Sequence, residues 1–313
     1  MGFISKPFGY FLDWLNTIFN GNFALSVFIF TLVLNLALLP LTIKTQKTTS
    51  KQARLRPKLD ALKKKYGDDK QKHSQAMQDL YARENVSMSG GCLPMVIRML
   101  IIFAVYYVVS NPLQYMLHYS VAEIQTITEA LKNAGYEITR SVDIMGHIKN
   151  GTITGIGLDS GLVSRLVADV ASVDFNFLGI DLTQTPTFSL NLSKMFSNNL
   201  WIIPIASFAS NMLNSIISMY MQKKTNPDAP NMAGMMLTMP LLSLWITFTV
   251  PCALGFYWTL SGIIQGGFQL FTQMVYNPNK IIAGEQAAEI IKAAKIEEGK
   301  LAAVSQKEAA DTQ

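Results

Sequence analysis

The chain has 313 residues, half of them hydrophobic and 15% charged, and it carries a net charge of +5. An ordinary soluble domain has roughly 25% charged residues, so this composition favours a protein with long lipid-facing segments. The two cysteines, Cys92 and Cys252, exclude a disulfide framework, and the three histidines show no spacing typical of metal ligands. The composition therefore predicts neither a metal site nor a cofactor.

The first segment, residues 1–22, is rich in aromatic residues. Phe8, Phe11 and Trp14 recur at helical spacing among polar residues. We expect an amphipathic helix that lies in the membrane interface. A first helix packed against protein explains the pattern equally well.

Five later segments are long and apolar enough to cross a bilayer core, which takes about 20 helical residues. Helices are the expected form, because backbone groups inside a bilayer must find partners within their own segment. The fold class is therefore an all-α integral membrane protein with five transmembrane helices. The predicted spans are residues 23–43, 94–111, 199–220, 233–250 and 253–275, and the last two form a tight hairpin.

The charges of the connecting segments predict the orientation of the spans. Segment 44–90 has twelve basic and five acidic residues, whereas segment 112–197 has five basic and eight acidic residues. The short connection 221–232 has two basic residues and one acidic residue. Because basic connections stay in the cytoplasm, we expect the N-terminus outside and the C-terminus inside.

The three longer segments outside the predicted spans differ in how their apolar and polar residues are arranged. Apolar residues at helical spacing on both sides of a Gly-Asp-Asp turn predict a cytoplasmic helical hairpin in residues 44–90. Residues 112–197 predict an external subdomain, and residues 276–313 a cytoplasmic tail that is disordered or a frayed helix. The basic residues of the hairpin are either an orientation signal or a docking surface for anionic lipid or ribosomal RNA. They include Arg54, Arg56, Lys58, Lys63, Lys64 and Lys65.

Polar side chains inside the spans are the candidates for function, because lipid disfavours them unless they face a partner or a watery cavity. Asn35 lies nine residues before Lys44, or ~13 Å from the inner edge. Arg98 lies seven residues after Gly91, or ~10 Å from the same edge. The two side chains could therefore face each other at similar depth.

The other polar candidates lie in the third and fifth spans. Asn211 is a candidate for a polar cavity, whereas Asn214 and Ser215 are expected to hold helices together. Ser261 and Gln265 lie one helical turn apart in the fifth span. A positive charge at Arg98 would attract an acidic residue beside a client's hydrophobic segment. Snorkelling of this side chain toward the head groups is the alternative.

Several separate stretches resemble the YidC family of membrane insertases in their order and spacing. The resemblance covers roughly residues 1–112 and 175–278. Each stretch alone is only weak evidence for the family, but their common order and spacing are specific for it. They are LPLTIK (39–44), PKLDALKKKY (57–66), GGCLPM (90–95), FLGIDL (177–182) and PCALGFYW (251–258).

The resemblance implies a bacterial plasma-membrane protein with a hydrophilic groove that is open to cytoplasm and lipid and closed to the outside. The family normally has arginine where this chain has Asn35 and glutamine where it has Arg98, so we expect Arg98 to supply the groove charge here. Asn211 matches a groove glutamine, and Tyr257 and Trp258 match the aromatic pair at the start of the last span. The implied partners are nascent membrane proteins, with the Sec translocon, the ribosome and anionic lipids, but no sequence-specific nucleic acid. We expect a monomer.

Three other functions compete with membrane insertion. A small-solute transporter or channel would be expected to have inverted repeats or broken helices at mid-membrane, and we find no repeat. An intramembrane enzyme would need a nucleophile with its base, or metal ligands, and the spans contain no His, Asp or Glu. An assembly chaperone for membrane complexes could use the same groove. We therefore expect no enzymatic activity.

Overall fold

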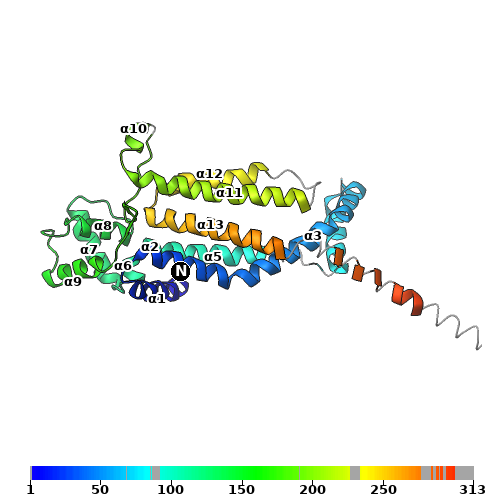
Figure 1. The fold of residues 1–313 in the computed structure, drawn as a ribbon, viewed down its shortest axis with the longest axis horizontal. Helices are drawn as coiled ribbons and strands as arrows, with labels where there is room; N and C mark the ends of the chain where they lie inside the picture. Colours follow the sequence, from blue (N-terminus) through cyan, green and yellow to red (C-terminus); the bar gives the residue numbers. More distant parts are fainter. Residues whose placement is uncertain are drawn as a thin grey trace, which may run out of the picture. The chain divides into compact units, whose positions relative to one another are not determined.

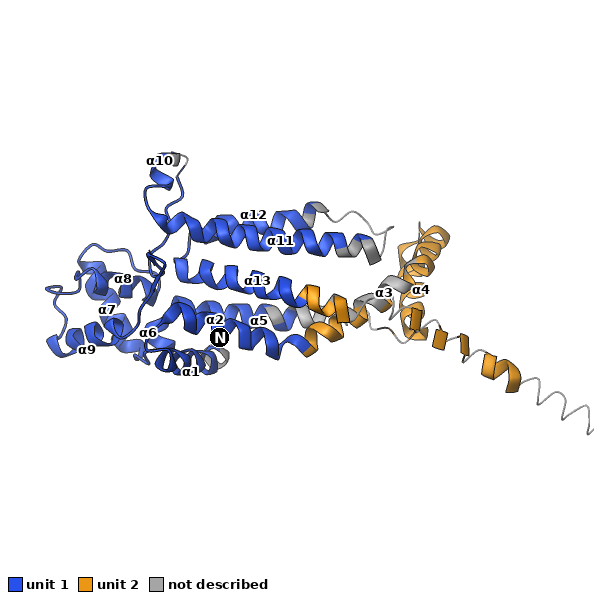
Figure 2. Cartoon of the chain, viewed as in Figure 1, with its two compact units in different colours: residues 1–39, 95–268 blue, residues 40–94, 269–313 orange. Residues whose placement is uncertain are grey.

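The structure is a computed structural model that describes residues 2–67, 69–84, 86, 92–189, 191–225, 233–275, 283–284, 287–288, 290–291 and 294–299. The chain forms two compact units (Figure 2). Residues 1–39 and 95–268 make the first, and residues 40–94 and 269–313 the second. Within the described ranges the secondary structure is helical except for one two-stranded hairpin.

Five long helices, each overlapping one predicted span, dominate the first unit. Figure 1 shows them running side by side, with shorter helices gathered at one end, which we call the capped end. The side chains of these apolar segments offer few hydrogen bonds to the backbone, so the backbone groups pair within each segment as a helix. The five are α2 (Phe23–Ala37), α5 (Cys92–Ser110), α11 (Ile202–Thr225), α12 (Ala233–Thr247) and α13 (Cys252–Val275).

Length and apolarity together identify fewer spans than the sequence predicts. In the described part of the chain, Asn199–Tyr220 alone meets both criteria. Phe23–Ala37 and Leu39–Thr45 would make a second span if the 45° bend between them lies within one crossing. Met99–Ser110 and Met236–Thr247 are apolar but shorter. The helical fold is thus confirmed, whereas five crossings and their orientation stay predictions.

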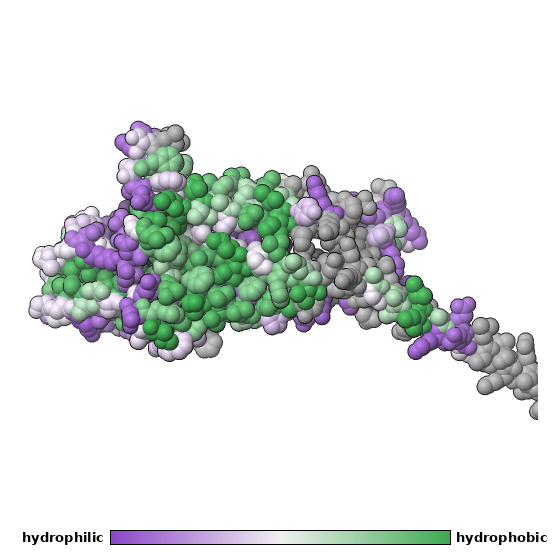
Figure 3. Space-filling view, viewed as in Figure 1, coloured by the Kyte–Doolittle hydropathy of each residue, from purple (hydrophilic) through white to green (hydrophobic). Residues whose placement is uncertain are grey.

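The outward faces of these helices carry many exposed apolar side chains. Figure 3 shows apolar surface extending over α11, α12 and α13. A soluble monomer rarely exposes apolar patches larger than a few hundred Å². The surface is therefore typical of a helical membrane protein. Exposed examples are Phe28, Leu36, Met99, Phe103, Leu213, Ile216, Leu241, Trp245 and Ile263.

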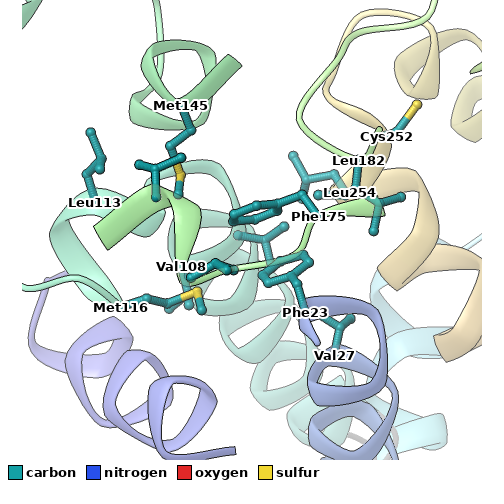
Figure 4. Close-up of a cluster of buried hydrophobic side chains, with 14 of the residues drawn as sticks. Phe23, Val27, Val108, Leu113, Met116, Met145, Phe175, Leu182, Cys252 and Leu254 are labelled. Atoms are coloured by element: carbon teal, nitrogen blue, oxygen red, sulfur yellow. The ribbon is translucent and has the colours of Figure 1, made fainter. Parts of the chain in front are cut away.

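The core of the first unit lies at the capped end (Figure 4). The rings of Phe23 and Phe175 lie 4.5 Å apart between centroids, and both side chains are fully buried. Val108 of α5 and Leu254 of α13 are also fully buried in this cluster. Burying such side chains stabilises by roughly 1.5–3 kcal/mol each, so the capped end is a firmly packed base for the helices.

The predicted external subdomain folds as short helices. They are α6 (Pro112–Tyr115), α7 (Val121–Asn133), α8 (Ser141–Lys149), α9 (Ser160–Ala171) and α10 (Leu192–Met195), with the hairpin strands β1 (Asn176–Phe177) and β2 (Ile180–Asp181). A capping box of Ser120 and Glu123 begins α7, and the Asp159 side chain caps α9. Their location outside a membrane stays a prediction.

An ion pair joins two helices of this subdomain. Arg165 of α9 pairs with Glu123 of α7, and its guanidinium lies 4.6 Å from the centre of the Tyr119 ring. Tyr119 donates a hydrogen bond to Asp169 over 2.6 Å. Hydrogen bonds from Ser120 and from Arg165 lower the pKa of Glu123, while burial and the bond to Asp169 raise the pKa of Tyr119. The network keeps α7 and α9 together.

Helix α1 (Gly2–Ile18) is amphipathic, as predicted for the first segment. Leu12 and Leu15 are buried, whereas Tyr10, Trp14 and Ile18 are exposed at intervals of four residues. One face thus packs on protein and the other presents aromatic and apolar side chains. This division fits both interpretations of the segment, so its place in a membrane interface stays a prediction.

The second unit contains the predicted helical hairpin, α3 (Leu39–Tyr66) and α4 (Lys70–Arg83). An ion pair between Lys58 and Glu84 joins α3 to the end of α4. Lys63, Lys64 and Lys65 are exposed in the last turn of α3, where cations favour the helix dipole. The side chains of Arg54 and Arg56 lie outside the described part, as does most of the tail 276–313.

Candidate functional site

Polar side chains gather where α11 meets α12. The Asn211 amide nitrogen of α11 donates to the carbonyl oxygen of Ser207 over 2.9 Å. The same nitrogen lies 3.4 Å from the hydroxyl of Ser243 on α12. Ser207 is fully buried, and Asn211 is half-buried. The predicted site residue Asn211 therefore lies between two helices and not on an outer face.

A second polar contact joins α11 to α13. The Asn214 amide nitrogen donates to the Gly262 carbonyl oxygen over 2.7 Å, which confirms the expectation that Asn214 holds helices together. Two glycines of α13, Gly262 and Gly266, allow α11 to come this close to α13. A Cβ on Gly262 would lie 2.7 Å from the hydroxyl of Ser210, and a Cβ on Gly266 would lie 2.4 Å from the Asn214 amide oxygen. We call Ser207, Ser210, Asn211, Asn214, Ser243, Ser261 and Gly262 the polar seam.

Three predicted site residues lie at intervals of four along α13 and so share one side of the helix. Tyr257 and Ser261 are buried, with 5% and 7% of their surface exposed, and Gln265 is half-buried. The Ser261 hydroxyl is buried and has no hydrogen-bond partner among the described residues. Trp258, the neighbour of Tyr257, is half-buried against the core. A buried hydroxyl of this kind has free capacity to bond with a polar group that enters between the helices.

For Asn35 of α2 and Arg98 of α5, which we expect to face each other, the structure describes one side chain of the two. Asn35 is buried, and its amide nitrogen donates to the carbonyl oxygen of Thr31 in the same helix over 2.8 Å. Arg98 lies near the start of α5, and its side chain is outside the described part. A pairing of Asn35 with Arg98 stays a hypothesis.

The composition of the helix interior changes along the first unit. At the capped end the buried side chains are apolar, and Phe23, Val27 and Leu254 have no more than 1% of their surface exposed. Farther from that end the buried side chains include Ser207 and Ser261 of the polar seam. The helix bundle is therefore tightly packed with apolar side chains at one end and more polar beyond it.

Residues 172–184, which we call the strap, close the capped end. Asp174 donates its N–H to the Gly21 carbonyl oxygen over 2.8 Å and accepts from the Phe23 N–H over 3.1 Å. At the other end of the strap, the carbonyl oxygens of Leu182 and Gln184 each accept a bond of 2.8 Å from the first residues of α13. The strap thus connects the starts of α2 and α13 and satisfies N–H groups that those helices leave free.

The strap includes the FLGIDL stretch, whose structural role was not predicted. Leu178 and Gly179 form the tip of the β-hairpin with positive φ of 51° and 82°. The Phe177 ring packs against Phe256 of α13, 4.7 Å between centroids. The sequence predicts a turn at Asn20-Gly21 and another at Leu178-Gly179, because glycine is common in turns. It does not predict which segments these turns contact.

The polar seam leads to a first prediction. Gly266→Ala should lower stability by about 1 kcal/mol, because the new methyl group must displace the Asn214 side chain and weaken its bond to Gly262. Gly267→Ala is the matched control, since a Cβ there meets no atom within 4 Å. Thermal unfolding of both variants in detergent measures the difference. A Gly266→Ala variant as stable as Gly267→Ala would show that the Asn214 contact contributes nothing.

The chemistry available to the described residues is that of hydrogen bonding and apolar contact. No three His, Cys, Asp or Glu side chains in the described ranges come together in a way that could hold a metal ion. The polar seam consists of amides, hydroxyls and a backbone carbonyl group. These groups largely bond to one another within and across the helices, and the Ser261 hydroxyl is the one seam group in the described ranges that is buried without a hydrogen-bond partner.

Comparison with known proteins relates most of the chain to one family. The model of the family described as "60Kd inner membrane protein" matches residues 14–280. A protein named membrane protein insertase YidC from Granulibacter bethesdensis is 27% identical over 277 residues, which are 87% of this chain and 38% of the relative. Membrane protein insertase YidC 2 from Listeria innocua is 26% identical over 304 residues, 96% of this chain and 78% of the relative. The chain thus spans less than half of the first relative and most of the second.

Proposed function

The chain belongs to the 60Kd inner membrane protein family, the YidC family, and on this premise we propose that it inserts hydrophobic segments of other proteins into a bilayer. The observation that carries the proposal is the polar seam, a set of hydrogen-bonding groups enclosed by helices whose outer faces are apolar. Polar groups inside the bundle would lower the cost of bringing the polar peptide groups of a client protein into the membrane.

The groove that we propose opens toward the cytoplasm and the lipid and is closed at the capped end. The burial of Phe23, Phe175 and Leu254 supports closure at that end, because no water-filled path fits through a tightly packed core. The strap supports it further by joining α2 to α13. A client's flank would bind within the groove, with Asn35, Asn211, Ser261 and Gln265 as bonding groups.

Release of the client needs no covalent step. Once the polar flank is accommodated, the apolar segment leaves sideways into lipid, because burial of its side chains gives roughly 25 cal/mol for each Å² removed from water. Tyr257 and Trp258 would form the closed end of the groove, where both pack near the core. Arg98 would attract acidic residues that flank the client's hydrophobic segment.

The same proposal assigns a topology and partners. Five crossings place the N-terminus and the subdomain 112–197 outside and the basic hairpin in the cytoplasm, in agreement with the charge of each segment. The exposed lysines of α3 would meet anionic lipid or the ribosome. The clients are nascent membrane proteins, received directly or beside the Sec translocon, and a monomer suffices for a groove open to lipid.

Reconstitution tests this function. The purified chain in liposomes should insert a single-span substrate with an acidic external tail, measured by protection of the tail from added protease. Empty liposomes and liposomes with an unrelated five-span protein are the controls. Insertion no greater than in the controls would reject autonomous insertion.

A further inference from the structure

Residues 185–201, which we call the finger, connect the strap to α11 and include α10. Figure 1 shows α10 standing away from the ends of α11 and α12. Two aromatic side chains of the finger are exposed, Phe188 by 58% and Phe196 by 47%. Exposed apolar side chains mark an interaction surface where they form a contiguous patch.

Ring contacts determine the level of the finger relative to the helices. The Phe196 ring packs edge-on against Trp201, 4.8 Å between centroids, and Trp201 lies at the start of the apolar segment Asn199–Tyr220. The Phe188 ring packs against Phe248, 5.4 Å between centroids, directly after the end of α12. Both rings are therefore at the ends of two apolar helices.

The surface next to the finger is apolar as well. Ile202 and Ile205 of α11 are 39% and 40% exposed, and they continue from the aromatic pair along the helix. The finger also carries an exposed cation, Lys194. Aromatic side chains and a lysine at the end of a spanning helix are the composition of the bilayer's interfacial layer, where rings meet the acyl boundary and the ammonium meets phosphate.

We propose that the finger is a membrane anchor in which Phe188 and Phe196 reach the acyl boundary beneath the head groups of the leaflet on the capped side. The partner is the lipid surface itself. The anchor holds the connection between the strap and α11 against the bilayer and so sets the height of α11 and α12 in it. This inference needs α11 to span the membrane, but it does not need insertase activity.

Spin labels test the depth of the finger. Single cysteines at Phe188 and Phe196, in a chain with Cys92 and Cys252 replaced by alanine, are labelled with a nitroxide after reconstitution in zwitterionic liposomes. Leu213, 59% exposed on α11, is the reference for lipid, and exposed Thr154 is the reference for water. Circular dichroism and the two reference labels establish that each variant is folded and oriented.

We expect the labels at Phe188 and Phe196 to collide with a polar nickel chelate about tenfold less often than the label at Thr154, because apolar layers exclude polar solutes. Their collision rates with oxygen should lie between those at Thr154 and at Leu213, because the acyl boundary is shallower than the middle of the span. Nickel accessibility equal to that at Thr154 would overturn the proposal. In that case the aromatic pair would be free in water and available to a protein partner instead. Insertion activity measured on the same liposomes separates this result from failure of the proposed function.

Discussion

Gly21→Ala is expected to destabilise the protein by several kcal/mol and to disorder the capped end. Gly21 has a φ of +82°, where a side chain costs about 1–2 kcal/mol. A Cβ there would also lie 2.1 Å from the Ser172 carbonyl oxygen, which is backbone and cannot rotate away. The strap would have to move, and with it the bonds between Asp174 and the start of α2.

Gly135→Ala is the matched control for this prediction. Gly135 has a φ of +91°, but a Cβ there meets no atom within 4 Å, so it bears the backbone cost without the clash. In a chain with Cys92 replaced by alanine, thermal unfolding can be followed through the Cys252 thiol, 1% exposed in the core beside the strap, with a thiol-reactive dye. If Gly21→Ala reacted no earlier on heating than Gly135→Ala, the strap would not be a structural closure.

The course of the helices was largely predictable from the sequence, because apolar runs and turn signals are local. The last span was predicted at 253–275 and α13 is Cys252–Val275. The sequence analysis does not predict the break between α2 and α3 at Leu38, although Pro40 indicates an interruption of the helix nearby. Proline lacks an N–H and its ring clashes with the carbonyl oxygen four residues earlier, here that of Leu36, so helix α2 ends at Ala37 and α3 begins at Leu39 with proline in its first turn.

The site was predictable only in part, because its contacts join segments far apart in the chain. Asn211 and Asn214 were both recognisable as polar groups in an apolar segment. Their different partners, Ser243 of α12 and Gly262 of α13, depend on how three helices pack. The strap escaped prediction for the same reason, since the sequence of residues 172–184 contains nothing that identifies Gly21 as its partner.

Arg98→Gln is expected to reduce insertion of a substrate with an acidic tail by about tenfold, the equivalent of ~1.4 kcal/mol. The physical reason is that, if Arg98 faces the proposed groove, the substitution removes a positive charge from a site of low dielectric, where it would attract the client's carboxylate more strongly than in water. Arg98→Lys keeps the charge and should keep most of the activity. A substrate with a neutral tail should be inserted equally well by all three proteins.

The double variant Asn35→Arg with Arg98→Gln tests whether the charge can move across the groove. If α2 and α5 supply opposite walls at similar depth, an arginine at position 35 should restore most of the insertion lost in Arg98→Gln. Asn35→Arg introduced together with Arg98 would place two like charges in one cavity, and we expect that variant to be less stable than wild type. Protease protection of the acidic tail measures all four proteins in parallel. Restoration would establish that the charge, and not the identity of the helix that bears it, drives capture of the flank. Undiminished insertion by Arg98→Gln alone would instead assign Arg98 to the lipid head groups, as a snorkelling side chain outside the groove.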